Sequence, residues 1–202
     1  MTGKGERVLN FTERHYKILV VSADDRFIKE VASLLQGDRF RPDASHSASD
    51  ARCKLLEKAY DLVVVNAPLR DDSGSRLCID VCRDNGTIAA IFAAADIYDE
   101  IYAKVSQYGV FVLQKPSSRA LVNQGISLMV CARERLRTLE KKVGKTESKL
   151  DEIRIVNKAK WLLIDHEGLS EEEAHKQIEK SAMDAGLTKK LAAQLIIDNY
   201  LK

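Results

Sequence analysis

Four cysteines and four histidines are the residues of this chain best suited to bind a metal ion. The cysteines are Cys53, Cys78, Cys82 and Cys131. None of them forms a Cys-x-x-Cys pair, and the histidines show no metal-ligand spacing. Cys78 and Cys82 lie one helical turn apart, but reduced cysteines on a helix in a reducing compartment are the simpler interpretation. We therefore expect no metal ion and no cofactor.

Catalytic patterns are also missing from the sequence. It contains no nucleophile–base pair and no glycine-rich phosphate loop, so we expect the protein not to be an enzyme. The formal net charge of +2 is too small to indicate nucleic-acid binding by itself. No apolar segment of a secretory signal precedes Lys17, and the longest apolar run, Ile88 to Ala95, is too short to span a bilayer. We expect a cytoplasmic protein that does not bind a membrane.

The N-terminal part of the chain alternates short apolar segments with helical patterns. The predicted strands are Lys17–Val21, Phe40–Ala44, Asp61–Val65, Ile88–Phe92 and Val110–Leu113. The predicted helices follow Asp24 and cover Ser49–Lys58, Gly74–Arg83 and Ile97–Tyr108. This alternation predicts a doubly wound α/β domain, a parallel five-stranded sheet with helices on both faces.

A long helical pattern then runs from Ser118 to Glu167. Small or apolar residues recur along it at alternating spacings of four and three, and charged residues fill the positions between them. The repeating residues are Met129, Ala132, Leu136, Leu139, Val143, Thr146, Leu150 and Ile153. This spacing is typical of the a and d positions of a coiled coil, so we predict a parallel homodimer through this seam. The alternative is one amphipathic helix that packs on its own domain.

The last segment of the chain predicts two further helices. Gly168 suits the end of the long helix, and Ser170 with Glu173 forms a capping box for the next one. Gly186 ends that helix, and Thr188 caps a final helix that bears Leu191, Leu195 and Ile196. With the end of the long helix, these form a small three-helix all-α domain.

The first segment resembles the receiver domains of two-component response regulators. The similarity rests on Lys115-Pro116, on Gly109, and on the spacing from Asn66 through Ala94 to Lys115. In that family an Asp closes the third strand and accepts a phosphoryl group, two acids after the first strand hold Mg²⁺, and a hydroxyl residue and a Lys complete the site.

This sequence departs from the receiver pattern at most reactive positions. Asn66 stands at the phospho-acceptor position, Ser22 and Ala23 at the acidic pair, and Ala94 at the hydroxyl position, while Asp24 and Asp25 are close by. Val112 stands where an aromatic switch residue often lies, and only Lys115 is kept. A neutral amide is a poor nucleophile, and Mg²⁺ prefers carboxylate oxygens. We predict that the domain is not phosphorylated, and that Lys115 makes a structural hydrogen bond or a salt bridge to a neighbouring acid.

The C-terminal segment, from about Ile153 to Leu201, resembles an ANTAR domain. The matching residues are Arg154, Ala159-Lys160, Leu162-Leu163, Gly168 to Ala174, Ala182-Met183 and Leu191 to Ala193. The resemblance implies binding to paired RNA stem-loops and prevention of transcription termination. Trp161 departs from a usual Gly and Asn157 from a usual Glu. We interpret Trp161 as a core residue in preference to a platform for RNA bases.

An RNA-binding surface would have to come from the position of the charges, because basic and acidic residues balance from Arg154 onward. The acids gather between Asp165 and Glu173. The candidate RNA-binding residues are Lys160, placed first, then Arg154, Lys189 and Lys190, followed by Lys158, Lys176 and Lys180. We expect about half of them to be ordinary solvated side chains.

The sequence therefore predicts an N-terminal tail over 1–15, a receiver-like domain over 16–124, a coiled-coil linker over 125–152 and an ANTAR domain over 153–202. The predicted function is RNA-binding antitermination as a dimer, controlled by a sensor or negative-regulator protein. The alternatives are a dimeric protein-interaction scaffold and a DNA-binding response regulator, which would need a recognition helix with base-reading side chains.

Overall fold

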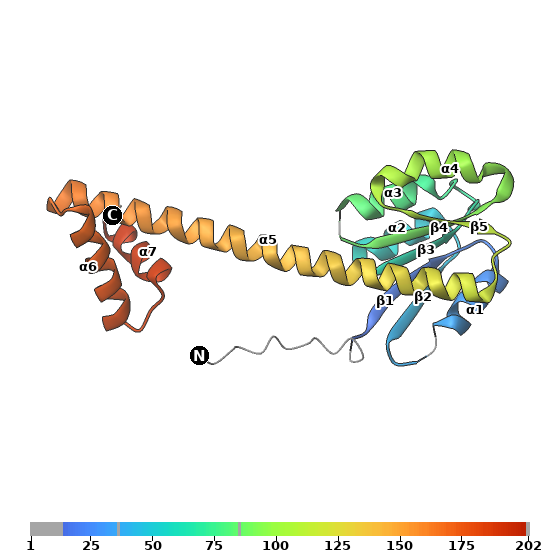
Figure 1. Ribbon diagram of the computed structural model, residues 1–202, viewed down its shortest axis with the longest axis horizontal. Helices are drawn as coiled ribbons and strands as arrows, with labels where there is room; N and C mark the ends of the chain where they lie inside the picture. Colours follow the sequence, from blue (N-terminus) through green and yellow to red (C-terminus); the bar gives the residue numbers. More distant parts are fainter. Residues whose placement is uncertain (1–13, 36, 85, 201–202) are drawn as a thin grey trace. The chain divides into compact units, whose positions relative to one another are not determined.

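The computed structural model describes residues 14–35, 37–84 and 86–200. The chain forms two compact units, divided between Arg137 and Thr138. One helix, α5 (Arg119–Glu167), contributes residues to both units (Figure 1). Among the described residues, no helix is both long and apolar enough to cross a membrane. Most of the predicted N-terminal tail lies outside the described residues.

The first unit is built on a parallel five-stranded sheet. Its strands are β1 (Tyr16–Val21), β2 (Phe40–Ser45), β3 (Leu62–Asn66), β4 (Ile88–Ala94) and β5 (Phe111–Lys115). They pair in the order β2-β1-β3-β4-β5, and every pairing is parallel. The predicted fold class is confirmed, since the five predicted segments all form strands of one sheet. The central strands β1 and β3 consist mainly of Val, Ile and Leu, because helices cover both of their faces.

Helices cover this sheet in two layers, as Figure 1 shows. The helices α2 (Ala48–Glu57), α3 (Ser75–Asp84) and α4 (Tyr98–Val105) share one core with residues of β1, β3 and β4. Short 3-10 turns at Ala95–Ile97 and Ser106–Tyr108 flank α4. The helix α1 (Asp25–Leu34) and the first turns of α5 pack on the opposite face. Cys78 and Cys82 both lie on α3, where burial raises the pKa of each thiol.

The first turns of α5 correct part of the predicted dimer seam. Met129 is 1% exposed and belongs to the core of the first unit, and Ala132 and Leu136 pack against that core. The alternative interpretation, a helix packed on its own domain, therefore holds for this part of α5. The rest of the predicted seam is different, because Leu139, Val143, Leu150 and Ile153 are each at least 40% exposed.

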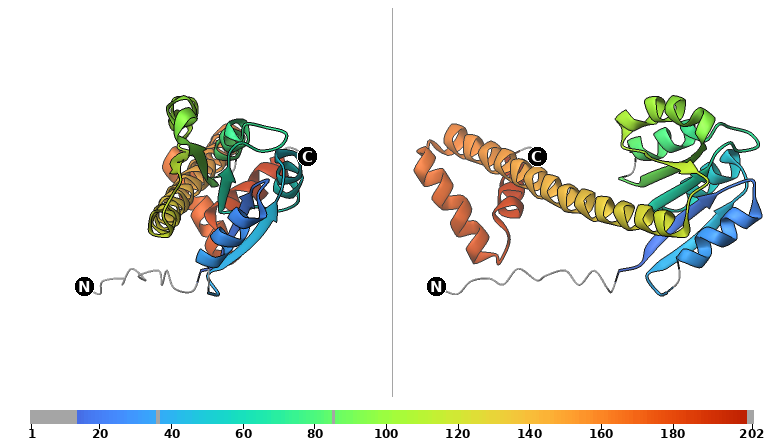
Figure 2. Two further views of the ribbon diagram at one scale, coloured as in Figure 1. Left: turned by 90° about the vertical axis from the view of Figure 1, so that its right-hand side faces the viewer. Right: turned by 45° about the vertical axis from the view of Figure 1, so that its right-hand side comes forward.

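The second unit is a small three-helix arrangement. The helices α6 (Glu171–Asp184) and α7 (Lys189–Tyr200) lie side by side against the end of α5 (Figures 1 and 2). The core is small, and its fully buried members are Ala159, Leu163, Ala174, Ile178, Ala193 and Ile197. The predicted capping box at the start of α6 is present, with Ser170 and Glu173 bonded reciprocally. Gly168, which follows α5, has a left-handed backbone with φ of 69°, a conformation that glycine adopts without strain.

Candidate functional site

The carboxyl ends of β1, β3 and β5 bring together three of the residues predicted for the degenerate receiver site. Asn66 ends β3, Ser22 follows β1, and Lys115 ends β5. The Nδ2 of Asn66 donates to Oγ of Ser22 at 2.9 Å, and the Nζ of Lys115 donates to Oδ1 of Asn66 at 2.8 Å. Lys115 also donates to the backbone carbonyl of Ala67. These bonds use both polar atoms of the Asn66 amide, which holds the position of the family's phospho-acceptor.

The residues around this amide add no carboxylate to it. Ser22 is fully buried, and its hydroxyl accepts a hydrogen bond from the backbone N–H of Asp24 at 3.0 Å. The carboxylate of Asp24 caps α1 by accepting from the N–H of Arg26, and that of Asp25 lies 3.7 Å from His46 Nδ1. Across the described residues, no group of three or more His, Cys, Asp or Glu side chains is placed to hold a metal ion.

Three further positions of the predicted site lie on or beside the strands of this sheet. Ala94 ends β4 and lies opposite Lys115 in the sheet register, so a methyl group stands where the family has a hydroxyl. Val112 is partly buried and packs against the core under α3 and α4. Ala23 follows Ser22 and is partly exposed.

Lys115 is the one charged group of this cluster, and no carboxylate within the described residues forms an ion pair with it. Its partners are an amide oxygen and a carbonyl oxygen, which agrees with the structural hydrogen bond predicted and not with the alternative salt bridge. Burial lowers the pKa of Lys115, because removal from water disfavours the charged ammonium. The positive charge therefore stays without a buried counter-charge.

Four of the seven basic residues predicted to bind RNA are engaged in ion pairs within the second unit. Lys160 meets Glu171 at 2.8 Å and Lys176 meets Glu172 at 2.7 Å. Lys189 pairs with Glu179, and Lys190 pairs with Asp151. Lys160 is the leading candidate for RNA binding from the sequence, but its side chain is only 16% exposed. Ion pairs near the surface are weak and can open, but in these four pairs a carboxylate of the same unit partly neutralises the charge of the lysine.

Arg154, Lys158 and Lys180 have no acidic partner among the residues that the structure describes, and all three are exposed. Arg154 and Lys158 lie one turn apart on α5, and Trp161 follows less than one turn later. At about 100° per residue, the three side chains fall within roughly 60° of one face of the helix. We call Arg154, Lys158 and Trp161 the basic aromatic strip.

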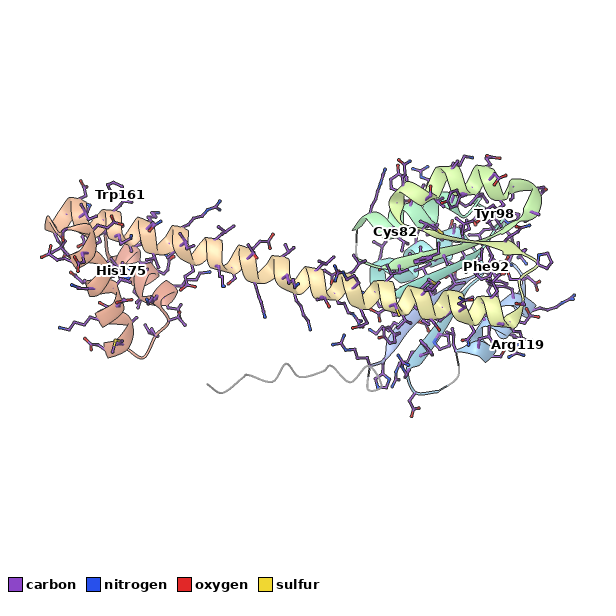
Figure 3. The ribbon with its side chains drawn as sticks, viewed as in Figure 1. Cys82, Phe92, Tyr98, Arg119, Trp161 and His175 are labelled. Carbon is purple, nitrogen blue, oxygen red and sulfur yellow. The ribbon has the colours of Figure 1, made fainter. Side chains whose placement is uncertain are left out.

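Trp161 was expected in the core, and that expectation is wrong. Its side chain is 70% exposed and projects from α5 near the end of the helix (Figure 3). The core face of α5 in this unit is set by Ala159 and Leu163. Trp161 lies two residues from each of them, so its side chain points to the opposite side of the helix. The spacing of the buried residues is the signal in the sequence that could have placed it outside.

A shallow hollow of about 180 Å³ adjoins the strip. Its lining residues are Asn157, Lys160, Trp161, Ile164 and Glu171. Two of these, Asn157 and Trp161, are the positions at which the chain departs from the ANTAR pattern. The departures therefore fall on one exposed surface of α5.

Comparison with known proteins finds similarity for both units. Residues 144–197 match the model of the ANTAR domain family. A stretch of 62 residues is 34% identical to adventurous-gliding motility protein Z of Myxococcus xanthus. That stretch covers 31% of this chain and only 4% of that protein, so the chain spans a small fraction of its relative.

The first unit is similar to solved receiver domains. The receiver domain of an HD domain-containing protein from Pseudomonas fluorescens superimposes with a TM-score of 0.56 at 20% identity, over 62% of this chain and 93% of that one. A CheY-like receiver domain protein from Methanospirillum hungatei gives 0.53 at 16% identity, over 60% and 98%. At these identities the similarity establishes the fold alone. The first unit thus has a receiver fold, and it is followed by a segment that matches the ANTAR domain family.

Proposed function

We propose that this protein is a transcription antiterminator that binds paired RNA hairpins as a dimer and is controlled by a partner protein, not by phosphorylation of an Asp. The observation that carries the proposal is the basic aromatic strip on the helix that opens the ANTAR domain. Arg154 and Lys158 supply positive charge that no acid of the described unit neutralises, and Trp161 supplies an exposed aromatic face.

RNA loops suit such a surface. Unpaired bases are recognised by stacking on aromatic side chains and by contacts of cations with phosphates. Stacking on one aromatic ring contributes about 1–3 kcal/mol. A protein-interaction surface would use an exposed Trp as well, but it would not need two unpaired cations beside it.

The exposed half of the seam supports the proposed dimer. Leu139, Val143, Leu150 and Ile153 are apolar, exposed and spaced as a and d residues of successive heptads. Burial of each against a second copy would remove apolar area worth about 25 cal/mol per Å². The same spacing continues to Asn157, which falls at an a position. A single Asn at an a position is a known device for fixing a parallel, in-register pair. In such a pair the two ANTAR domains lie at one end, where they can meet two hairpins together.

Control by a partner is supported by the chemistry of the first unit. The neutral network of Asn66, Ser22 and Lys115 offers no anionic nucleophile to a phosphoryl group. A regulator of this organisation must then receive its signal through a surface or a bound molecule.

The test is RNA binding measured by filter retention at two salt concentrations. The probes are a two-hairpin RNA, a scrambled RNA of equal length and a duplex DNA. We expect preference for the two-hairpin RNA and an affinity that falls as salt rises. Preference for the duplex would favour a DNA-binding regulator, and absence of binding to all three would favour the protein-interaction scaffold.

A further inference from the structure

A pocket of about 560 Å³ lies between α1 and the beginning of α5, on the opposite face of the sheet from α2, α3 and α4. This volume falls in the range of small-molecule binding sites. Figure 3 labels Phe92 and Arg119, which line it at the end of the first unit where α5 begins. The pocket is distinct from the RNA-binding surface proposed above and belongs to the first unit alone.

Most of the pocket wall is apolar. Phe27, Val31 and Leu34 of α1 line one side, and Val122 of α5 lines the other. Phe92 lies at the base, with its ring edge-to-face against Phe27 at 5.1 Å between centroids. Such a wall would accommodate an aromatic or aliphatic body and gives little to a fully polar ligand.

Two cations stand at this pocket without an acidic partner among the described residues. The Nζ of Lys115 is bonded to Asn66 and Ala67, and the guanidinium of Arg119 donates to Oγ of Ser33 at 3.2 Å. Every acceptor in these bonds is a neutral oxygen, so neither positive charge is compensated by them. An ammonium has three donors, and the two bonds described for Lys115 leave one for a further acceptor. The beginning of α5 adds the positive end of a long helix at the same place.

Glu30 is the acidic residue of the pocket lining, and it has no ion pair among the described residues either. With two cations against one carboxylate, the lining carries a net positive charge. A ligand with one negative charge would meet an excess of positive charge, and removal of Glu30 would increase that excess.

We propose that this pocket binds a small organic anion with an apolar body, held by Lys115 and Arg119 at its charged end and by Phe27, Leu34 and Phe92 along its length. Substitution of the phospho-acceptor by Asn66 supports this assignment, because it removes the carboxylate that would otherwise neutralise Lys115. A ligand bound there would contact α5, the helix that also carries the proposed RNA-binding strip.

A matched pair of dyes tests the proposal on the full-length protein. The anion is 8-anilinonaphthalene-1-sulfonate, and the control is N-phenyl-1-naphthylamine, which has the same aromatic body without the sulfonate. In fluorescence titrations we expect the sulfonate to saturate one site per chain and to bind at least about tenfold more tightly than the neutral dye.

Variants locate the binding site of the sulfonate. Arg119→Gln and Lys115→Gln should each weaken its binding about tenfold, whereas Glu30→Gln should strengthen it. Lys104→Gln removes a cation of α4 and serves as the matched control. Leu34→Trp fills the pocket and should abolish binding, with far-ultraviolet circular dichroism to verify the fold. Because Arg119 is exposed, its variant keeps the test decisive even if Lys115→Gln fails to fold.

Equal binding of the two dyes, or sulfonate binding that is unchanged in both Arg119→Gln and Leu34→Trp, would overturn the proposal. Either result would place the dye on other apolar surfaces, such as exposed Leu191 and Leu195. The dye titrations involve no RNA. A negative dye result therefore does not bear on the proposed antiterminator function, and absence of RNA binding does not bear on the proposed anion site.

Discussion

The Nζ of Lys115 lies 2.8 Å from Oδ1 of Asn66, so the cation that ends β5 is bonded to a neutral amide at the position where receiver domains have the phospho-acceptor. The other side of the same amide donates to Ser22. The three residues thus form a hydrogen-bond network that uses both polar atoms of the Asn66 amide.

Incubation with acetyl phosphate and Mg²⁺ should leave the mass of the protein unchanged. Asn66→Asp alone should also remain unmodified, because Ser22 and Ala23 still replace the acids that hold the metal ion. Intact-mass spectrometry measures both. A stoichiometric, labile phosphoryl adduct on the wild type would contradict this expectation.

The carboxylate of Asp71 should make the stability of the first unit depend on pH. Its carboxylate accepts from the backbone N–H of Ala48 at 2.8 Å, and from the N–H and hydroxyl of Ser49 at 2.9 and 2.8 Å, at the start of α2. These bonds favour the ionised form and lower the pKa of Asp71 from 3.8 to about 2. A lowered pKa contributes stability above pH 3.8, and that contribution is lost as the pH falls through about 2.

Asp71→Ala should therefore lower the urea midpoint at pH 7, and its difference from wild type should shrink between pH 4 and pH 2. Urea unfolding followed by circular dichroism at a series of pH values measures this difference. Asp71→Asn, which cannot titrate, should keep a constant difference from Asp71→Ala. A wild-type advantage that persists unchanged at pH 2 would show that the carboxylate charge is not its cause.

Leu139→Lys combined with Leu150→Lys should convert the proposed dimer to monomers, because each lysine would bring an unpaired charge into the apolar seam. Light scattering at micromolar concentration measures the mass. Leu56→Lys is the matched control, since Leu56 is 89% exposed on α2, outside the seam. A wild-type protein that is already monomeric would remove the seam as a dimer interface.

The sheet and the small helical unit could be predicted from local sequence patterns. The surface against which each part of the long helix packs could not. The strands β3, with Val63, and β4, with Ile91, are continuous apolar runs. The capping box of Ser170 and Glu173 directly predicts the beginning of α6. Met129 was misplaced because a row of apolar residues at spacings of three and four packs equally well against a sheet or a second helix. The pairing of Lys190 with Asp151 joins residues 39 positions apart, so no local pattern reveals which cations are neutralised.

Trp161 is the residue whose replacement should separate RNA binding from folding. Its side chain is 70% exposed, so Trp161→Ala should leave the helix content and the dimer unchanged. Loss of one stacked base costs about 1–3 kcal/mol, which corresponds to roughly a five- to 150-fold weaker Kd for the two-hairpin RNA.

Arg154→Gln and Lys158→Gln should each lower the slope of log affinity against log salt by about one. Lys160→Ala should have a smaller effect, because Lys160 is mostly covered and paired with Glu171. Met183→Ala, an exposed apolar residue at 81% on α6, is the control for Trp161. If Lys160→Ala weakens binding while Trp161→Ala does not, the RNA lies on the side of α5 near Glu171, and the strip of Arg154, Lys158 and Trp161 is not its binding surface.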